Sequence, residues 1–286
     1  MTVLRTARAL LILGRVSNLP TVWSNCLAGW LLGGAGSTTV LPPLLIGASL
    51  LYIGGMFLND AFDAEFDRQF RQERPIPSGA ISTRTVWLIG CTLLLVGAAV
   101  LFLITPTTGY FGLLLAGCIL LYDWLHKRIA FAPVLMAACR FVLYLVAAST
   151  TSNAISGVTV WCAVALASYI VGLSYLARRE SMPGALQYWP LVFLVIPIFL
   201  ALIVNVGSYR NDALLVSALL AAWILRSIRY TLWEPKPQIG RTVAGLLAGI
   251  VWVDWLAVPY VSRELSVIFI ALFIAALVFQ RFVPAT

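Results

Sequence analysis

Acidic residues are concentrated in one short stretch of this chain, from Asp60 to Glu73, which holds five of the eleven Asp and Glu residues. At 100° per residue on an α-helix, Asp60, Asp63 and Asp67 lie within an arc of about 60°, whereas Glu65 points elsewhere. Converging carboxylates repel one another, and each raises the pKa of the others unless a positive group neutralises them. The stretch therefore needs a cation beside it.

A divalent metal ion is one cation that would neutralise this stretch. Carboxylates and an amide such as Asn59 offer only oxygen ligands, which suit Mg²⁺, an ion that takes one or two carboxylates, several waters and substrate phosphate oxygens. The pattern therefore predicts a Mg²⁺–diphosphate site at a membrane surface. The alternative is a solvated acidic face on a short interfacial helix, which the spacing of the aspartates alone does not exclude.

The composition is that of a membrane protein. Of the 286 residues, 61% are hydrophobic and 10% are charged, and the mean hydropathy is +0.96. Apolar runs of about twenty residues recur along the whole length, and each is long enough to cross a bilayer as a helix. We expect an all-α polytopic membrane protein with a single helical domain over residues 1–286.

Ten segments are predicted to be membrane helices, separated by turns rich in Gly, Pro, Thr and Ser. They are residues 16–32, 41–58, 85–104, 109–125, 134–148, 158–177, 189–206, 213–228, 242–258 and 265–282. The segment before them combines Arg5, Arg8 and Arg15 with leucines and has no small-residue cleavage site, so we expect an amphipathic lead-in that is retained.

The basic residues predict the orientation in the membrane. If the amino terminus is cytoplasmic, only Arg210 and Arg263 of the nineteen Lys and Arg residues lie on the outer side. Because basic residues favour cytoplasmic loops, we expect a protein of a bacterial inner (cytoplasmic) membrane whose acidic stretch faces the cytoplasm. The same distribution argues against nucleic acid as a partner, despite the net charge of +8. The five cysteines lie in apolar runs without C-x-x-C spacing, which indicates buried thiols.

The acidic stretch continues into a second pattern. Asn59-Asp60-x-x-Asp63-x-x-x-Asp67 is followed by Arg74-Pro75-Ile76-Pro77-Ser78-Gly79, and the combination resembles the first aspartate-rich motif of the UbiA superfamily of intramembrane prenyltransferases. Two other segments look like further family positions. They are Arg15-Val16-Ser17-Asn18-Leu19-Pro20 and Tyr122-Asp123-Trp124-Leu125-His126-Lys127-Arg128.

The resemblance implies a bundle of nine or ten transmembrane helices around a central cavity, in which Mg²⁺ holds an isoprenyl diphosphate. The implied metal ligands are Asn59, Asp60, Asp63 and Asp67. The implied contacts to the diphosphate are Lys127, Arg15 and Arg74. Together with the three aspartates, Lys127 is the expected catalytic residue.

The chemistry of prenyl transfer agrees with this assignment. Cleavage of an allylic C–O bond places negative charge on the diphosphate, which metal ions and cationic side chains stabilise. Aromatic faces attract the positive prenyl carbon by about 0.5 to 2 kcal/mol per contact, although Tyr and Trp at helix ends are also common interface anchors. The aromatic candidates are Phe62, Phe66, Tyr122, Trp124, Tyr144, Tyr169 and Tyr175.

The second half departs from the family pattern. A second aspartate-rich motif is expected after the sixth predicted helix, but the chain reads Arg178-Arg179-Glu180 there. Two guanidiniums can bind diphosphate oxygens bidentately and replace a metal ion with fixed positive charge. The alternative is that Arg178 and Arg179 only anchor the cytoplasmic side. The departure resembles a divergent branch similar to the EboC-type proteins of bacterial gene clusters, and it leaves the acceptor open.

Two charged residues, Arg140 and Asp254, lie inside predicted membrane helices. A charge exposed to lipid there costs about 2.5 to 3.5 kcal/mol, so both are expected to face the bundle interior or a watery cavity. Asp254 is a candidate proton acceptor or acceptor ligand, or else a structural hydrogen-bond partner, and Arg140 could help the diphosphate or snorkel. With Asn18, Tyr122 and Tyr175 they complete the candidate cavity residues.

The sequence therefore predicts an enzyme of the lipid bilayer that uses Mg²⁺ to transfer an isoprenyl group from an isoprenyl diphosphate to an unidentified small-molecule acceptor. One alternative keeps the fold and cyclises the allylic cation, as terpene cyclases of the same superfamily do. The other is a non-catalytic lipid-binding protein or transporter, in which the carboxylates form a solvated face.

Overall fold

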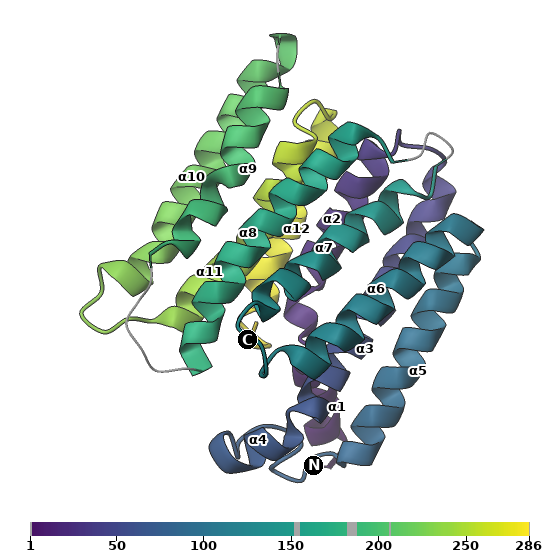
Figure 1. The fold of residues 1–286 in the computed structure, drawn as a ribbon, viewed down its shortest axis with the longest axis vertical. Coiled ribbons are helices and arrows are strands. Elements are labelled where there is room, and N and C mark those ends of the chain that lie inside the picture. The colour runs from purple at the N-terminus through teal and green to yellow at the C-terminus, as the bar shows by residue number, and fades with distance from the viewer. Residues whose placement is uncertain (1, 152–154, 182–187, 206, 286) are drawn as a thin grey trace.

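The chain folds as a bundle of long, roughly parallel and antiparallel α-helices (Figure 1). The computed structural model describes residues 2–151, 155–181, 188–205 and 207–285. In this part of the chain there are α-helices and short 3-10 helices but no strand. The α-helices are α1 (Thr2–Leu13), α2 (Leu19–Leu32), α3 (Leu41–Phe62), α4 (Ala64–Phe70), α5 (Thr83–Phe102), α6 (Pro106–Leu125), α7 (Ala132–Ala148), α8 (Gly157–Ser181), α9 (Pro190–Val204), α10 (Arg210–Leu232), α11 (Ile239–Ala257) and α12 (Arg263–Phe279). The 3-10 helices are η1 (Val16–Asn18), η2 (Thr38–Val40) and η3 (Gly207–Tyr209).

Each of the ten predicted membrane segments overlaps one α-helix, and the differences lie at the ends; residues 16–18 of the first segment form η1. The segment predicted as 41–58 continues to Phe62 in α3, so that Asn59 and Asp60 belong to the helix itself. The segment predicted to start at residue 109 starts at Pro106, where the Thr105 hydroxyl accepts a hydrogen bond from Thr108 N at 3.0 Å. The predicted end at residue 206 lies outside the described residues.

The structure adds two helices to those predicted. The lead-in before residue 16 is helical as α1, and α4 follows α3 after a break at Asp63. Figure 1 shows α4 at the base of the bundle, beside the amino-terminal end of the chain. Both helices lie at the same end of the bundle as the acidic stretch.

The length and apolar composition of the helices are those of an integral membrane protein. Six of the described helices are long and apolar enough to cross a bilayer, and α7 and α9 are shorter apolar helices. Their outward faces remain apolar, with Leu88, Leu95 and Val267 each more than 60% exposed. An apolar surface of this kind is unfavourable in water but favourable against lipid chains. The number of spanning helices, predicted as nine or ten, stays a prediction.

Small residues determine which helix faces pack together, because apolar side chains in lipid gain little by turning inward. Gly47 and Gly54 of α3 face Gly97 and Gly90 of α5, and a Cβ built at Gly54 would lie 3.0 Å from the Gly90 carbonyl oxygen. At Gly29 of α2, a Cβ would lie 2.7 Å from Ala147 Cβ of α7. The backbones of these helix pairs can approach this closely only because the side chains are absent.

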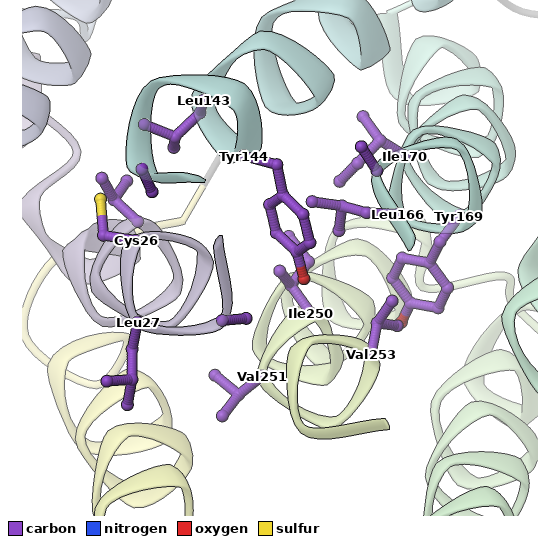
Figure 2. Close-up of a cluster of buried hydrophobic side chains, with 14 of the residues drawn as sticks. Cys26, Leu27, Leu143, Tyr144, Leu166, Tyr169, Ile170, Ile250, Val251 and Val253 are labelled. Carbon is purple, nitrogen blue, oxygen red and sulfur yellow. The ribbon is translucent and has the colours of Figure 1, made fainter. Parts of the chain in front are cut away.

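The centre of the bundle is formed by α2, α7, α8 and α11, as Figure 2 shows. Tyr144 from α7 and Tyr169 from α8 are fully buried and both point toward α11. The Tyr169 hydroxyl donates to the Leu246 carbonyl at 2.9 Å, which satisfies the polar end of a side chain surrounded by apolar atoms. In Figure 1, α9 and α10 stand at one edge of the bundle and α5 at the opposite edge.

Two pockets lie away from the acidic stretch. One, of about 30 Å³, is lined by residues of α8, α9 and α11, including Cys162, Ala201 and Leu256. The other lies between α8, α9, α10 and α11 and includes Leu176 and Thr242. Neither borders the aspartates, so the predicted central cavity stays a prediction.

The close contact between α2 and α7 makes Gly29 a test of this packing. We expect Gly29→Ala to lower the free energy of unfolding by about 1 to 3 kcal/mol, because the added methyl group meets backbone atoms that cannot move aside. The matched control is Gly117→Ala in α6, where a Cβ would have no neighbour within 4 Å. Thermal unfolding in detergent measures both, and an equal effect of the two changes would contradict the packing described.

Candidate active site

The acidic stretch occupies the end of α3, the break that follows, and α4. Asn59 and Asp60 lie in the last turn of α3, Asp63 at the break, and Asp67 in α4. The Asp63 N–H donates to the Asn59 carbonyl at 3.0 Å and the Asp67 N–H to the Asp63 carbonyl at 2.9 Å. The helical hydrogen-bond pattern thus continues through the break, and it keeps the three carboxylates on one side.

These aspartates are not a solvated face. Asp60, Asp63 and Asp67 are 5%, 7% and 2% exposed. By contrast, the side chain of Glu65 is 76% exposed and pairs with Arg68, as expected for the residue that points elsewhere on the helix. A buried carboxylate is stable only beside a positive group, so each of these aspartates requires one.

Cationic side chains from three other segments supply that charge. Asp60 Oδ1 lies 3.3 Å from Arg15 Nη2 and 3.3 Å from Arg74 Nη1. Arg74 Nη1 also lies 2.9 Å from Asp67 Oδ2. Asp63 Oδ1 lies 2.8 Å from Lys127 Nζ and 3.1 Å from His126 Nε2. The three cations predicted to contact a diphosphate therefore meet at the predicted metal ligands.

Arg15 reaches Asp60 from a strained backbone position. It joins α1 to η1 with a φ of +40°, in the left-handed region that few residues other than glycine adopt. Its carbonyl oxygen accepts hydrogen bonds from the Asn18 N–H at 3.0 Å and the Tyr52 hydroxyl at 3.4 Å. The surrounding contacts hold this conformation and so place the guanidinium at the site.

The segment from Arg74 to Gly79 forms a compact loop that presents Arg74. The Ser78 N–H donates to the Arg74 carbonyl at 3.0 Å, and Gly79 closes the loop with a φ of +73°. Ile76 is buried in a small apolar cluster that includes Leu13 and Phe57. Each part of the motif thus has a physical reason: the arginine supplies charge, the isoleucine anchors the loop, and the glycine permits the turn.

The end of α6 supplies the remaining cation. Besides its ion pair with Asp63, Lys127 Nζ lies 3.7 Å from the centre of the Phe66 ring, a cation–π contact. Burial raises the pKa of Asp63, but hydrogen bonds and positive charge from His126 and Lys127 outweigh it and bring the pKa below its ordinary value. Tyr122 stacks on the His126 ring, with the ring centres 5.2 Å apart.

The donor set at this site suits a hard divalent cation. In the described part of the chain no three His, Cys, Asp or Glu side chains are already arranged around a common metal position, and the carboxylates of the site pair with basic side chains instead. Yet Asp67 Oδ1 and Asp123 Oδ2 are buried oxygens without a hydrogen-bond partner there. Buried, unpartnered carboxylate oxygens are what Mg²⁺ would use, so the residues present fit this ion.

Other predicted diphosphate contacts lie elsewhere. Arg178 donates through Nη1 to the carbonyls of Ile129 at 3.0 Å and Ala130 at 2.7 Å, so it braces the loop after α6 and does not reach the aspartates. Tyr175 packs edge-on against Trp189 with the ring centres 4.6 Å apart. The side chain of Arg179 lies outside the described residues.

The two intramembrane charges belong to a separate buried network. Asp254 accepts hydrogen bonds from Ser24, from Asn25 Nδ2 at 2.7 and 2.8 Å, and from the Tyr144 hydroxyl at 2.5 Å. Arg140 donates to Asn25 Oδ1 at 2.6 Å, so the Asn25 amide bridges the two opposite charges. Both face the interior, with their polar atoms bonded to neighbouring helices, which is the pattern of a structural role.

Asn18 lies at another contact, beside the last described residues. Its Nδ2 donates to the Ala285 carbonyl at 3.0 Å, and Ser17 Oγ donates to the Pro284 carbonyl at 3.4 Å. Its own amide oxygen is buried without a partner in the described chain. Asn18 also fixes Arg15 through its N–H, so it supports the site through the backbone.

Asp123 and His126 are site residues that the sequence alone did not assign. His126 contacts Asp63, and its Nδ1 lies 3.0 Å from the Asp123 carbonyl oxygen, while Asn59 Nδ2 donates to Asp123 Oδ1 at 3.1 Å. A signal was present: residues 123, 126 and 127 share one face of the end of a helix, because they are three and four positions apart.

Comparison with known proteins places this arrangement in a family context. The model of the UbiA prenyltransferase family matches residues 18–282. Digeranylgeranylglyceryl phosphate synthase of Thermococcus gammatolerans is 35% identical over 116 residues, which cover 37% of this chain and 42% of that protein. Protoheme IX farnesyltransferase of Bdellovibrio bacteriovorus is 35% identical over 97 residues, 32% of each chain. The matches thus span less than half the length of these relatives.

Solved structures share the fold over nearly the whole chain. A UbiA homolog from Aeropyrum pernix K1 superimposes with a TM-score of 0.68 at 16% identity, covering 85% of this chain and 96% of that one. A chain solved in a study of digeranylgeranylglyceryl phosphate synthase in membranes gives a TM-score of 0.60 at 17% identity, covering 95% and 98%. The family match over most of the length and the common fold agree, and the chain belongs to the UbiA prenyltransferase family.

Proposed function

We propose that this protein is an intramembrane prenyltransferase that uses Mg²⁺ to bind and ionise an isoprenyl diphosphate. The observation that carries the proposal is the meeting of three buried aspartates with Arg15, Arg74 and Lys127, which come from three separate segments. A purely structural ion-pair cluster could use fewer charges. A site that must hold both a metal ion and a polyanion needs both signs of charge in one place.

The exchange of partners explains how one site serves both ligands. In the structure each aspartate is neutralised by a basic side chain. When Mg²⁺ is bound, Asn59, Asp60, Asp63 and Asp67 would hold it, and the ion would supply positive charge to the carboxylates in place of part of that from the basic side chains. Arg15, Arg74 and Lys127 are then free to donate to the diphosphate. Because a divalent ion and a diphosphate carry opposite charges of similar size, each buried charge of the site still faces an opposite charge when both are bound.

The reaction follows from this charge distribution. The electron pair of the allylic C–O bond leaves with the diphosphate, whose growing negative charge is stabilised by the basic side chains and by the Lewis acidity that Mg²⁺ supplies when bound. The prenyl carbon becomes positive and is attacked by the nucleophile of the acceptor, which then loses a proton. Phe66, beside Lys127, is an aromatic face at the diphosphate end of the site.

The relatives leave the acceptor open, because their names differ in the molecule that is prenylated. They include digeranylgeranylglyceryl phosphate synthase, protoheme IX farnesyltransferase and, in Pectobacterium carotovorum, 4-hydroxybenzoate octaprenyltransferase at 27% identity over 124 residues. We propose that the donor is an isoprenyl diphosphate and the acceptor a small molecule that reaches the site through the bilayer.

The orientation proposed for the membrane puts this site at the cytoplasmic face. Its basic residues lie with those of the other cytoplasmic segments predicted from the charge distribution, and only Arg210 and Arg263 are assigned to the outer side. We propose a bacterial inner membrane, with nine or ten of the helices crossing it. On this arrangement water-soluble diphosphate leaves directly to the cytoplasm.

The aspartates give the direct test. We expect Asp60→Asn, Asp63→Asn and Asp67→Asn each to lower the rate of prenyl transfer about 100- to 1000-fold, as the loss of a preorganised charge does in other enzymes. The readout is the prenylated lipid that accumulates in cells expressing the protein, identified by mass spectrometry. The matched control is Glu65→Gln, because Glu65 lies in the same stretch but is exposed. Full accumulation of product with the Asp67→Asn variant would contradict the proposal.

A second test separates transfer from cyclisation. Purified protein in nanodiscs, given Mg²⁺ and isoprenyl diphosphates of several lengths without a lipid extract, is expected to form no cyclic product. Adding an extract of the native membrane is expected to yield a prenylated compound and inorganic diphosphate. A cyclic hydrocarbon or alcohol formed without extract would instead assign the protein to terpene cyclisation, and binding without diphosphate release in either case would make it a carrier.

A further inference from the structure

Asp123 lies against the aspartate site but has no part in the reaction described above. It is in the last turn of α6, is 2% exposed, and accepts a hydrogen bond through Oδ1 from Asn59 Nδ2. Its second oxygen, Oδ2, is buried and has no hydrogen-bond partner in the described chain. Buried polar atoms are nearly always paired, so this carboxylate oxygen is one that a ligand can use.

Two contacts tie Asp123 to the aspartates. One is the bond from Asn59, which immediately precedes Asp60. The other runs through His126, whose Nδ1 lies 3.0 Å from the backbone carbonyl oxygen of Asp123 and whose Nε2 lies 3.1 Å from Asp63 Oδ1. Among the ion pairs of the described residues, the basic side chains of the site pair with Asp60, Asp63 and Asp67 and leave Asp123 without a cation.

The bond to Asp123 also determines which way Asn59 faces. Because Asn59 donates through Nδ2 to the Asp123 carboxyl group, its NH₂ group is turned toward Asp123 and its amide oxygen away. An amide oxygen is a ligand for a hard cation, whereas an amide nitrogen is not. Asp123 therefore keeps Asn59 in the orientation that lets it serve as a metal ligand.

We propose that Asp123 is a further oxygen ligand of the divalent cation, binding it through Oδ2 while Oδ1 holds Asn59. The proposal rests on the proposed function, since the ion is the one that accompanies the diphosphate. In this proposal, ligands of the cation come from α3, α4 and α6. It also gives the unpartnered oxygen of Asp123 the positive partner that the basic side chains do not provide.

Metal binding, measured without turnover, tests the proposal. The full chain in nanodiscs, with inorganic diphosphate added, is titrated with Mn²⁺ in place of Mg²⁺, and bound Mn²⁺ is followed by electron paramagnetic resonance. We expect Asp123→Asn to weaken Mn²⁺ binding about 10- to 100-fold, the usual loss on altering a group in or beside the metal shell. The matched control is Asp212→Asn, an exposed aspartate of α10, which is expected to bind as the wild type does.

A double variant separates a ligand from a residue that only orients Asn59. If Asp123 binds the ion, Asn59→Ala with Asp123→Asn binds Mn²⁺ more weakly than Asn59→Ala alone. Equal affinities of these two variants, or wild-type affinity of Asp123→Asn, would overturn the assignment. Thermal unfolding in EDTA checks folding, and Asp123→Ser is the second variant if Asp123→Asn folds poorly. Absence of Mn²⁺ binding by the wild type with diphosphate would overturn the proposed metal site as a whole, a result distinct from failure of Asp123 alone.

Discussion

The need to neutralise buried carboxylates governs the active end of this protein. Three aspartates lie in a region of low dielectric constant, and each is stable only because a basic side chain lies within an ion-pair distance. Those basic side chains come from the α1–η1 junction, the loop after α4 and the end of α6. The charge requirement therefore fixes how three segments, far apart in the sequence, must meet, and the helices behind them serve to bring that meeting about.

Behind the site, the bilayer imposes a different constraint. Apolar side chains gain little by turning inward when the solvent is lipid, so close packing decides which faces meet. The glycines that line α3 against α5, and Gly29 against α7, let the backbones approach. The few buried polar groups are then gathered into networks such as the one that joins Arg140 to Asp254 through Asn25. Packing and polar satisfaction together specify the bundle.

Much of this arrangement could be predicted from the sequence because its signals are local. Apolar runs of spanning length located the helices, and the spacing of Asp60, Asp63 and Asp67 located one charged face. The partners were harder, because ion pairs join distant segments. Arg15 and Arg74 were expected near the aspartates only through a family resemblance, and Arg178, expected there as well, instead bonds to carbonyls after α6. Asp123 was missed because an acidic residue at the end of an apolar helix resembles an ordinary interface residue until its neighbours are known.

Arg178 links the carboxyl-terminal end of α8 to the loop after α6. Its guanidinium donates hydrogen bonds to the carbonyls of Ile129 and Ala130, which lie two and three residues after Lys127. The loop that positions Lys127 is thus joined to α6 through the chain and to α8 through these hydrogen bonds. The same loop begins at Lys127, whose ammonium group lies 2.8 Å from Asp63 Oδ1. A residue of the second half thus helps to hold the geometry of a site whose described ion pairs all come from the first half.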